Sequence, residues 1–221
     1  MNWLTRMEID ADIAFSEGGV DNYSWHKKIW SCFPNMQDQT REFLSRIDVL
    51  DGSFFIWMLS PDMPVCPNWC PADKFYTKQI KPTFLNHRYY AFDIRVNPTK
   101  CLVTRIGGKR IGHGKCVPIT DEVDLRNWLI RKGNVRCRDN NTNAEIPGGF
   151  RIVEDKPLEI RPMVEYHFSK KGHQGYHGGV QFRGTLEVTN REHFIETYKN
   201  GIGSAKGFGF GLLLISPIEL K

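Results

Sequence analysis

No stretch of the 221 residues approaches the roughly 18 consecutive apolar side chains that a membrane-spanning helix needs. The opening segment, MNWLTRMEIDADIAF, carries acidic residues and lacks the layout of a secretory signal peptide. Disorder is not indicated either, because 40% of the residues are hydrophobic and 25% are charged. We therefore expect a cytoplasmic globular protein without a membrane partner, long enough for one large domain or two small ones.

The familiar phosphate-binding motifs are also missing. The segment GIGSAKGFGFGLLLISPI (201–218) is rich in glycine, but Lys206 occupies the sixth position of its G-x-G-x-x-G frame. A predicted helix precedes these glycines and a strand follows them, which is the reverse of the dinucleotide and P-loop order. A small-molecule nucleotide enzyme is therefore disfavoured. Two interpretations remain: a loop whose backbone N–H groups and Lys206 contact phosphate, or a tight connection packed against a neighbouring domain.

Metal-binding patterns are weak. Of six cysteines, only Cys66 and Cys70 in CPNWC lie close together, and no second pair follows at ligand spacing, so a zinc site there is the minority interpretation. Asp10 and Asp12 could suggest a metal nuclease, but no further carboxylates cluster around them. We expect no cofactor and no bound metal, and free thiols rather than disulfides in a cytoplasmic setting.

Charge is distributed unevenly. Residues 1–60 carry five basic and nine acidic side chains, a net charge of −4, so the remaining residues must carry +9 to give the total of +5. Such asymmetry is typical of a polyanionic partner, most often nucleic acid, although a solvated basic face would look the same. Between residues 88 and 116 there is one acid, Asp93, against Arg88, Arg95, Lys100, Arg105, Lys109, Arg110 and Lys115.

The periodicity of the first half predicts two strands flanking a helix and a hairpin. Asp51 and Gly52 separate two strand-like runs and predict the hairpin turn. Asp21 or Asn22 caps the helix, and Pro34 prevents its continuation. A Pro/Cys-rich stretch stands where a second helix would be expected. The predicted elements are a strand over 3–11, a helix over 20–33, a hairpin over 43–60 and a strand over 74–82.

The second half repeats the order. Thr120 or Asp121 caps its first helix, and Thr189 with Glu192 predicts a capping box for its second. The predicted elements are a strand over 88–97, a helix over 120–134, strands within 149–168 and over 179–189, a helix over 189–201 and a strand over 208–217; KGHQGYHGG, with His173 and His177, is interpreted as a loop. Two such runs predict an α+β protein of tandem ferredoxin-like (RRM-like) βαββαβ domains, at 1–85 and 86–221.

Four ordered blocks of sequence resemble one known family. They are the opening strand with YSWHKKIWSCFP, then FDIRVNPTK, then IGHGKCVPITDE with NWLIRKG, and the closing VQFRGTLEVTNREHFIETYKNGIGSAKGFGFGLLLISPI. Together they resemble the RAMP superfamily of CRISPR-associated RNA-processing proteins, and more narrowly the type I-E CasE family. The resemblance implies recognition of a CRISPR repeat RNA hairpin and metal-independent cleavage at the 3′ base of its stem. It also implies that the protein keeps its product as a subunit of the Cascade complex, beside other Cascade subunits.

The same resemblance implies the catalytic residues. His26 matches the family's catalytic histidine and Tyr23 its catalytic tyrosine, and residues three apart share a helix face. Imidazole, with an ordinary pKa near ~6.5, suits a general acid or base. Lys27, Lys28 or Lys206 would neutralise the phosphorane. Family members often carry a further cation slightly later on this helix, where this chain has IWSC, so that role has no residue here.

The RNA contacts are assigned to the basic and glycine-rich segments. A-form hairpins are read through shape, phosphates and unstacked ends, so cations and exposed backbone are the expected contacts. The alternative is a non-catalytic RAMP-fold subunit that binds an RNA hairpin without cutting it, and the Tyr23–His26 pair favours the enzyme. The candidates are Lys27, Lys28, Arg105, Lys109, Arg110, Lys115, Lys170, Lys171, Gly203, Lys206 and Gly207.

Overall fold

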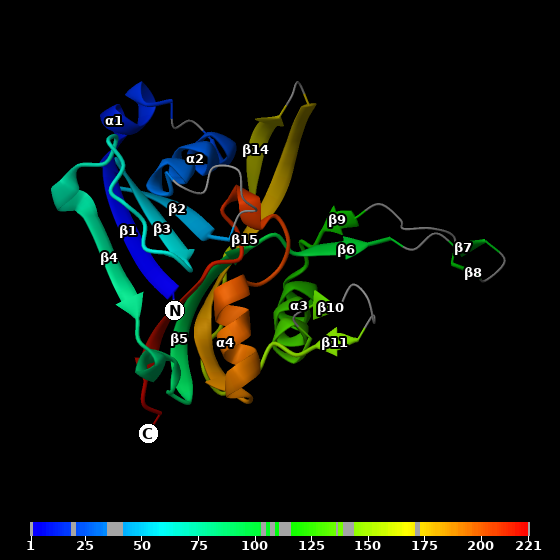
Figure 1. Ribbon diagram of the computed structural model, residues 1–221. Helices are drawn as coiled ribbons and strands as arrows, with labels where there is room; N and C mark the ends of the chain where they lie inside the picture. The colour runs from blue at the N-terminus through cyan, green and yellow to red at the C-terminus, as the bar shows by residue number, and fades with distance from the viewer. Residues whose placement is uncertain are drawn as a thin grey trace.

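Two antiparallel sheets lie side by side, one from each half of the chain, with helices packed on them (Figure 1). No helix in the described part of the chain is long and apolar enough to cross a membrane. The structure is a computed structural model that describes residues 2–18, 21–34, 42–102, 105–106, 109–110, 116–135, 137–138, 144–170 and 173–220.

The first sheet has the strand order β2-β3-β1-β4, which is the order of a ferredoxin-like fold. Its predicted hairpin is confirmed: Asp51 and Gly52 both have positive φ, 50° and 77°, which suits a tight two-residue turn. Its elements are β1 (Asn2–Asp10), α1 (Ala11–Ser16), α2 (Asn22–Ile29), η1 (Trp30–Cys32), β2 (Leu44–Leu50), β3 (Ser53–Ser60), η2 (Ala72–Lys74) and β4 (Phe75–Ile80). The short helix α1 was not predicted. As the Pro/Cys-rich stretch suggested, no second long helix follows the hairpin in this described segment, and the 3₁₀ turn η2 lies in that place.

The second sheet repeats this order as β12-β15-β5-β16, so the predicted tandem ferredoxin-like fold is confirmed. The long strand β15 also pairs with β13 and β14, and helices α3 and α4 lie against the sheet (Figure 1). Its elements are β5 (Tyr89–Val96), α3 (Glu122–Asn134), β12 (Phe150–Ile152), β13 (Glu159–Ile160), β14 (Val164–Lys170), β15 (His173–Val188), α4 (Arg191–Asn200), η4 (Lys206–Phe208) and β16 (Leu213–Ile218). A short 3₁₀ helix, η3 (Pro82–Leu85), connects the sheets.

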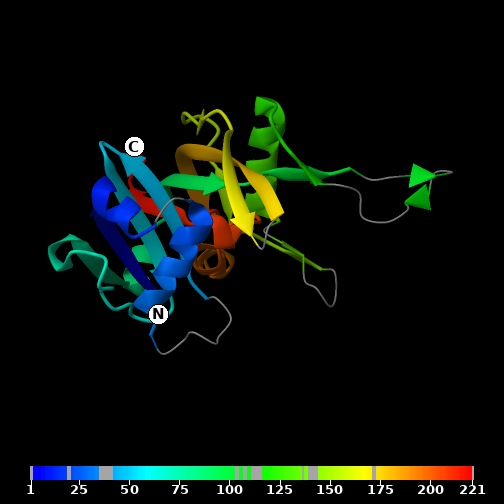
Figure 2. The same cartoon turned by 90° about the horizontal axis from the view of Figure 1, so that it is seen from above.

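Short two-stranded ribbons are inserted around α3. One of them, in green, points away from both sheets in Figure 2. The paired strands are β6 (Thr99–Cys101) with β9 (Cys116–Pro118), β7 (Arg105–Ile106) with β8 (Lys109–Arg110), and β10 (Cys137–Arg138) with β11 (Glu145–Ile146).

Several predictions of local structure were wrong. His173 and His177 lie in strand β15, because pairing with β14 extends a segment whose glycines suggest a loop. The cap of α4 is Asn190, whose side chain accepts a 3.0 Å hydrogen bond from the His193 N–H. Cys101 and Cys116 face each other across β6 and β9 and form a disulfide, so the expectation of free thiols fails for this pair.

The buried apolar residues form two clusters, and one of them joins the sheets. Leu44 and Leu59 of the first sheet pack in the same cluster as Ile94 and Trp128 of the second half. Burial of a Leu side chain contributes about 1.5–3 kcal/mol, so these two residues tie the halves together. The other cluster lies under α2 and includes Trp25.

A network of ion pairs links the two sheets between β2 and β5. Arg46, only 3% exposed on β2, donates to Asp93 on β5 at 2.6 Å and lies 3.0 Å from Asp48. Arg95 on β5 donates in turn to Asp48 at 2.6 Å and to the carbonyl of Ile47 at 2.7 Å. Four charges from two sheets therefore alternate in sign and satisfy one another.

The contribution of this ion-pair network to stability depends on pH. Burial by itself would raise the pKa of Asp93, but hydrogen bonds from Arg46, Arg183 and Gln181 outweigh burial and hold that pKa below its ordinary value of 3.8. A carboxylate with a depressed folded pKa stabilises the fold fully above the unfolded pKa, and this contribution is lost as the pH falls below it.

We expect Arg46→Ala to lower the free energy of unfolding by about 3–5 kcal/mol at pH 7, because it leaves Asp93 and Asp48 without their buried partner. Urea denaturation would measure the loss, and the difference from wild type should shrink below pH 3.8 as Asp93 becomes protonated. Arg161→Ala is the matched control, since its pair with Glu159 is about half exposed and worth at most about 1 kcal/mol. Equal losses in the free energy of unfolding for the two variants would contradict a stabilising role of the buried ion-pair network.

Candidate active site

Helix α2 is fixed at its start by a capping box. The Asp21 carboxylate accepts from the Ser24 N–H at 2.6 Å, and the Ser24 hydroxyl lies 3.0 Å from the Asp21 N–H as its acceptor. Of the two predicted caps, Asp21 is therefore the one used. Trp25 and Ile29, four residues apart, are buried in the core and hold one face of the helix against the sheet.

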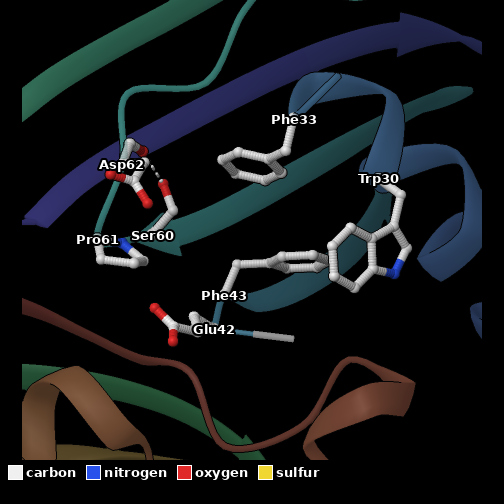
Figure 3. A pocket seen from close by; sticks show the side chains of 7 residues that line it. All are labelled: Trp30, Phe33, Glu42, Phe43, Ser60, Pro61 and Asp62. Atoms are coloured by element: carbon white, nitrogen blue, oxygen red, sulfur yellow. Dashed lines mark hydrogen bonds between the residues drawn. The ribbon is translucent and has the colours of Figure 1, made fainter. Parts of the chain in front are cut away.

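Aromatic packing sets the orientation of His26. Its ring centroid lies 5.7 Å from that of Phe43 and 6.3 Å from that of Trp30. Phe43 in turn stacks on Phe33 at 5.4 Å and meets Trp30 edge-on at 5.2 Å. Figure 3 shows these three rings gathered around one small pocket at the end of the helix. The imidazole of His26 is therefore half-buried and positioned by neighbouring rings.

The CPNWC segment packs against helix α2. Trp69 packs against Trp25 with ring centroids 5.9 Å apart and donates a 2.9 Å hydrogen bond to the Ser31 hydroxyl. Burial raises the pKa of the Cys70 thiol to about 12, so this thiol stays protonated at neutral pH. No group of three or more His, Cys, Asp or Glu side chains within the described ranges is arranged to hold a metal. The segment thus packs against α2, and the zinc interpretation gains no support.

The glycines of 201–211 close a tight loop. The Ile202 N–H donates to the Gly211 carbonyl at 3.0 Å, and the Gly211 N–H donates to the Arg95 carbonyl at 2.8 Å. Gly201 and Gly211 have φ of 71° and 86°, and a Cβ on either would lie 2.6–2.7 Å from a backbone oxygen. Only glycine fits such an approach. Close packing at the base of the loop therefore explains Gly201 and Gly211, while the tip at Lys206–Phe208 is half-buried.

The tip of the loop reaches helix α2. The turn η4, red in Figure 1, contacts both α2 and β2. A hollow of about 420 Å³ beside it is lined by Lys206, by Phe43, which also packs on His26, and by Glu42. The structure thus brings together two predicted parts that lie 180 residues apart, the His26 helix and the Lys206 turn.

Two further residues of this hollow were not predicted. Lys199 and Asn200 end α4 and line the hollow beside Lys206. Lys199 also pairs with Glu196 at 3.1 Å. The only signal in the sequence was their position in the last helical turn before the glycines.

The other predicted site residues differ in their setting. Lys27 is exposed, whereas Lys28 pairs with Glu17 at 3.0 Å and is the weaker candidate. Gly203, with φ of 86°, lies over the ring of Trp128, and Gly207 belongs to η4. Of the remaining candidates, Tyr23 lies in the first turn of α2, Arg105 in β7, Lys109 and Arg110 in β8 and Lys170 at the end of β14, while Lys115 and Lys171 lie outside the described residues.

Comparison with known proteins assigns the family. Residues 2–217 match the model of a family described as CRISPR associated protein. The chain is 28% identical to the CRISPR system Cascade subunit CasE of Escherichia coli, over 90% of this chain and 93% of that one. It is 25% identical to the CRISPR-associated endoribonuclease Cse3 of Thermus thermophilus, over 97% of this chain and all of that one.

Solved structures agree with the fold. Cas6e of Escherichia coli matches with a TM-score of 0.67 at 23% identity, over 99% of this chain and 100% of that one. Cse3 of Thermus thermophilus, bound to an RNA representing a pre-cleavage complex, matches with a TM-score of 0.73 at 20% identity, over 98% and 99%. These structures confirm the fold, and the family model confirms the resemblance drawn from the sequence.

The close approach within the glycine loop can be tested by a matched pair of substitutions. We expect Gly211→Ala to lower the free energy of unfolding by about 1–3 kcal/mol more than Gly18→Ala, because both glycines have positive φ but only Gly211 has no room for a Cβ. Urea denaturation measures both values. Equal losses would mean that positive φ alone, and not packing, explains the glycine.

Proposed function

Because the chain belongs to the CRISPR-associated protein family, we propose that it is the endoribonuclease that cuts precursor CRISPR RNA at the 3′ base of the repeat hairpin. The observation that carries the proposal is the contact between α2, which bears His26, and the Lys206 turn of the glycine loop. A general acid or base and a cation on one phosphate are what metal-free RNA cleavage requires. The relatives named as a Cascade subunit and as an endoribonuclease support it.

The proposed reaction uses the substrate's own 2′-hydroxyl. Its oxygen attacks the adjacent phosphorus, the bond to the 5′-oxygen of the next nucleotide breaks, and a 2′,3′-cyclic phosphate and a 5′-hydroxyl result. His26 transfers a proton to or from these oxygens, and such a group contributes about 10²–10⁴-fold in rate. Tyr23 orients the 2′-hydroxyl, and Lys206 stabilises the charge on the phosphorane.

We further infer the assembly of the protein. The product stays bound, and the protein acts as a Cascade subunit with its neighbours in that complex, as the name of the Escherichia coli relative suggests. The substrate is an intracellular transcript, so we infer that the protein works in the cytoplasm. The first domain would end at residue 85, where η3 connects β4 to β5.

The first experiment is cleavage of a labelled repeat RNA in EDTA by the wild type and by His26→Ala. We expect the wild type to cut and His26→Ala to lose about 10²–10⁴-fold in single-turnover rate while its affinity for the RNA stays unchanged, because only proton transfer is removed. His87→Ala, which removes an exposed histidine at the junction of the sheets, should cut like the wild type. A wild type that binds the hairpin tightly and never cuts would replace the enzyme with a non-catalytic hairpin-binding subunit.

A second prediction concerns Lys206. If this cation contacts a phosphate, Lys206→Ala should weaken binding and reduce the slope of log affinity against log salt by about one unit. Filter binding at several salt concentrations, with a 2′-deoxy substitution at the cleavage site, measures the slope without cleavage. Lys81→Ala, an exposed lysine beside η3, should leave the slope unchanged. An unchanged slope for Lys206→Ala would exclude that contact.

A further inference from the structure

One disulfide lies at the outer end of the β6–β9 ribbon. Cys101 is the last residue of β6 and Cys116 the first residue of β9, and the two are paired across the strands. They are 15 positions apart in the sequence, so their disulfide closes the 14 residues between them into a covalent loop. The disulfide therefore lies where the described pairing of β6 with β9 ends.

The loop that this disulfide closes is strongly basic. Residues 102–115 contain no aspartate or glutamate and four cations, Arg105, Lys109, Arg110 and Lys115. Arg105 of β7 lies directly opposite Arg110 of β8, and like charges at opposite positions of a strand pair repel each other. This repulsion opposes the pairing of β7 with β8 unless a polyanion neutralises the charges, so the pairing needs support from elsewhere.

The remaining support of the ribbon is weak within the described residues. The pairing of β6 with β9 spans three residue pairs, and an isolated two-stranded ribbon is only marginally stable in water. Lys100 pairs with Asp124 of α3 at 3.1 Å, but both side chains are about half exposed, and such ion pairs contribute little. The ribbon also points away from both sheets (Figure 2). The disulfide is therefore the covalent constraint that holds the basic loop together.

Both cysteines of this disulfide are accessible to other thiols. Cys101 and Cys116 are exposed, whereas Cys32 and Cys70 are buried, and burial raises the pKa of each of these two thiols to about 12. Thiol–disulfide exchange requires that a thiolate reach a disulfide sulfur. Disulfides of cytoplasmic proteins are usually transient and often sense redox conditions. The exposed position thus suits reversible reduction better than a permanent structural role.

We propose that the Cys101–Cys116 disulfide is a redox site that controls the affinity of the protein for the repeat RNA. A dithiol reductant supplies two electrons and two protons: the S–S bond breaks, Cys101 and Cys116 become free thiols, and the two sulfurs of the reductant form a disulfide. The oxidised loop binds RNA more tightly, because less conformational freedom remains to be lost on binding. This redox control rests on the proposed function, since it requires the basic loop to contact RNA.

Cleavage itself should not depend on the disulfide. His26 and Lys206 lie outside residues 102–115, on α2 and η4. Reduction should therefore change the affinity for RNA and leave the single-turnover rate at saturating RNA unaltered. A general loss of structure would instead lower both.

The test compares the full-length protein in its oxidised and reduced forms. Alkylation followed by mass spectrometry first shows, without RNA, whether Cys101 and Cys116 are joined before and free after treatment with dithiothreitol. Filter binding then measures the affinity for repeat RNA that carries a 2′-deoxy group at the cleavage site, at one salt concentration. The variants are the double substitution Cys101→Ser with Cys116→Ser and, as the control, Cys66→Ser, which removes an exposed free thiol outside the ribbon.

We expect the oxidised wild type and oxidised Cys66→Ser to bind the RNA about 5- to 150-fold more tightly than their reduced forms, the usual range of coupling between two sites. The double variant should bind like the reduced wild type, with or without dithiothreitol. Because coupling is reciprocal, saturating RNA should lower the reduction potential of the disulfide by the same factor, which is about 20–65 mV for a two-electron couple.

Equal affinities of the oxidised and reduced wild type, with the RNA still bound and cut, would overturn the redox site alone. A cysteine pair that stays reduced in the presence of oxidised glutathione would do the same, as would a double variant that binds like the oxidised wild type. An oxidised wild type that does not bind the repeat RNA would instead overturn the proposed function, and the redox control with it.

Discussion

The alternating ion pairs between β2 and β5 are the constraint on which the functional arrangement depends. Arg46 and Asp48 come from the first sheet, and Asp93 and Arg95 from the second. The candidate site likewise takes α2 from the first half and the glycine loop from the second, so neither half contains it alone. The Arg95 carbonyl also accepts from Gly211, so the same strand that holds the ion pairs holds the base of the loop. A shift of one sheet against the other would separate α2 from the η4 turn that carries Lys206.

Ion pairs within the protein also explain part of the uneven charge distribution. Part of the basic excess of the second half is used inside the protein: Arg88 pairs with Glu187, Arg95 with Asp48 and Lys100 with Asp124. Arg95 is therefore only 13% exposed, whereas Lys100 at 54% still meets solvent. The charge available to RNA is smaller than composition suggests. Two lysines, Lys199 and Lys206, line the hollow beside the glycine loop.

One hollow beside the glycine loop joins the two halves of the chain. Its lining combines Phe43 of the first half, which packs on His26, with Lys199 and Lys206 of the second half. Backbone hydrogen bonds at Ile202 and Gly211 close the loop that carries Lys206.

The sequence by itself determined most of the strand and helix order, the Asp51–Gly52 turn and the tandem fold, because each depends on residues near one another in the chain. It left the cap of α3 open between Thr120 and Asp121, and the structure uses Asp121. The resemblance in YSWHKK pointed to His26 before its surroundings were known. Only the tertiary structure decided that β15 runs through the glycines around His177, that Asn190 rather than Thr189 caps α4, and that Cys101 meets Cys116. Those outcomes depend on pairing and packing between distant segments, whose contacts leave no periodic pattern in the sequence. The same reason applies to the Lys206 hollow, whose lining combines Phe43 with Lys199 and Lys206 from the other end of the chain.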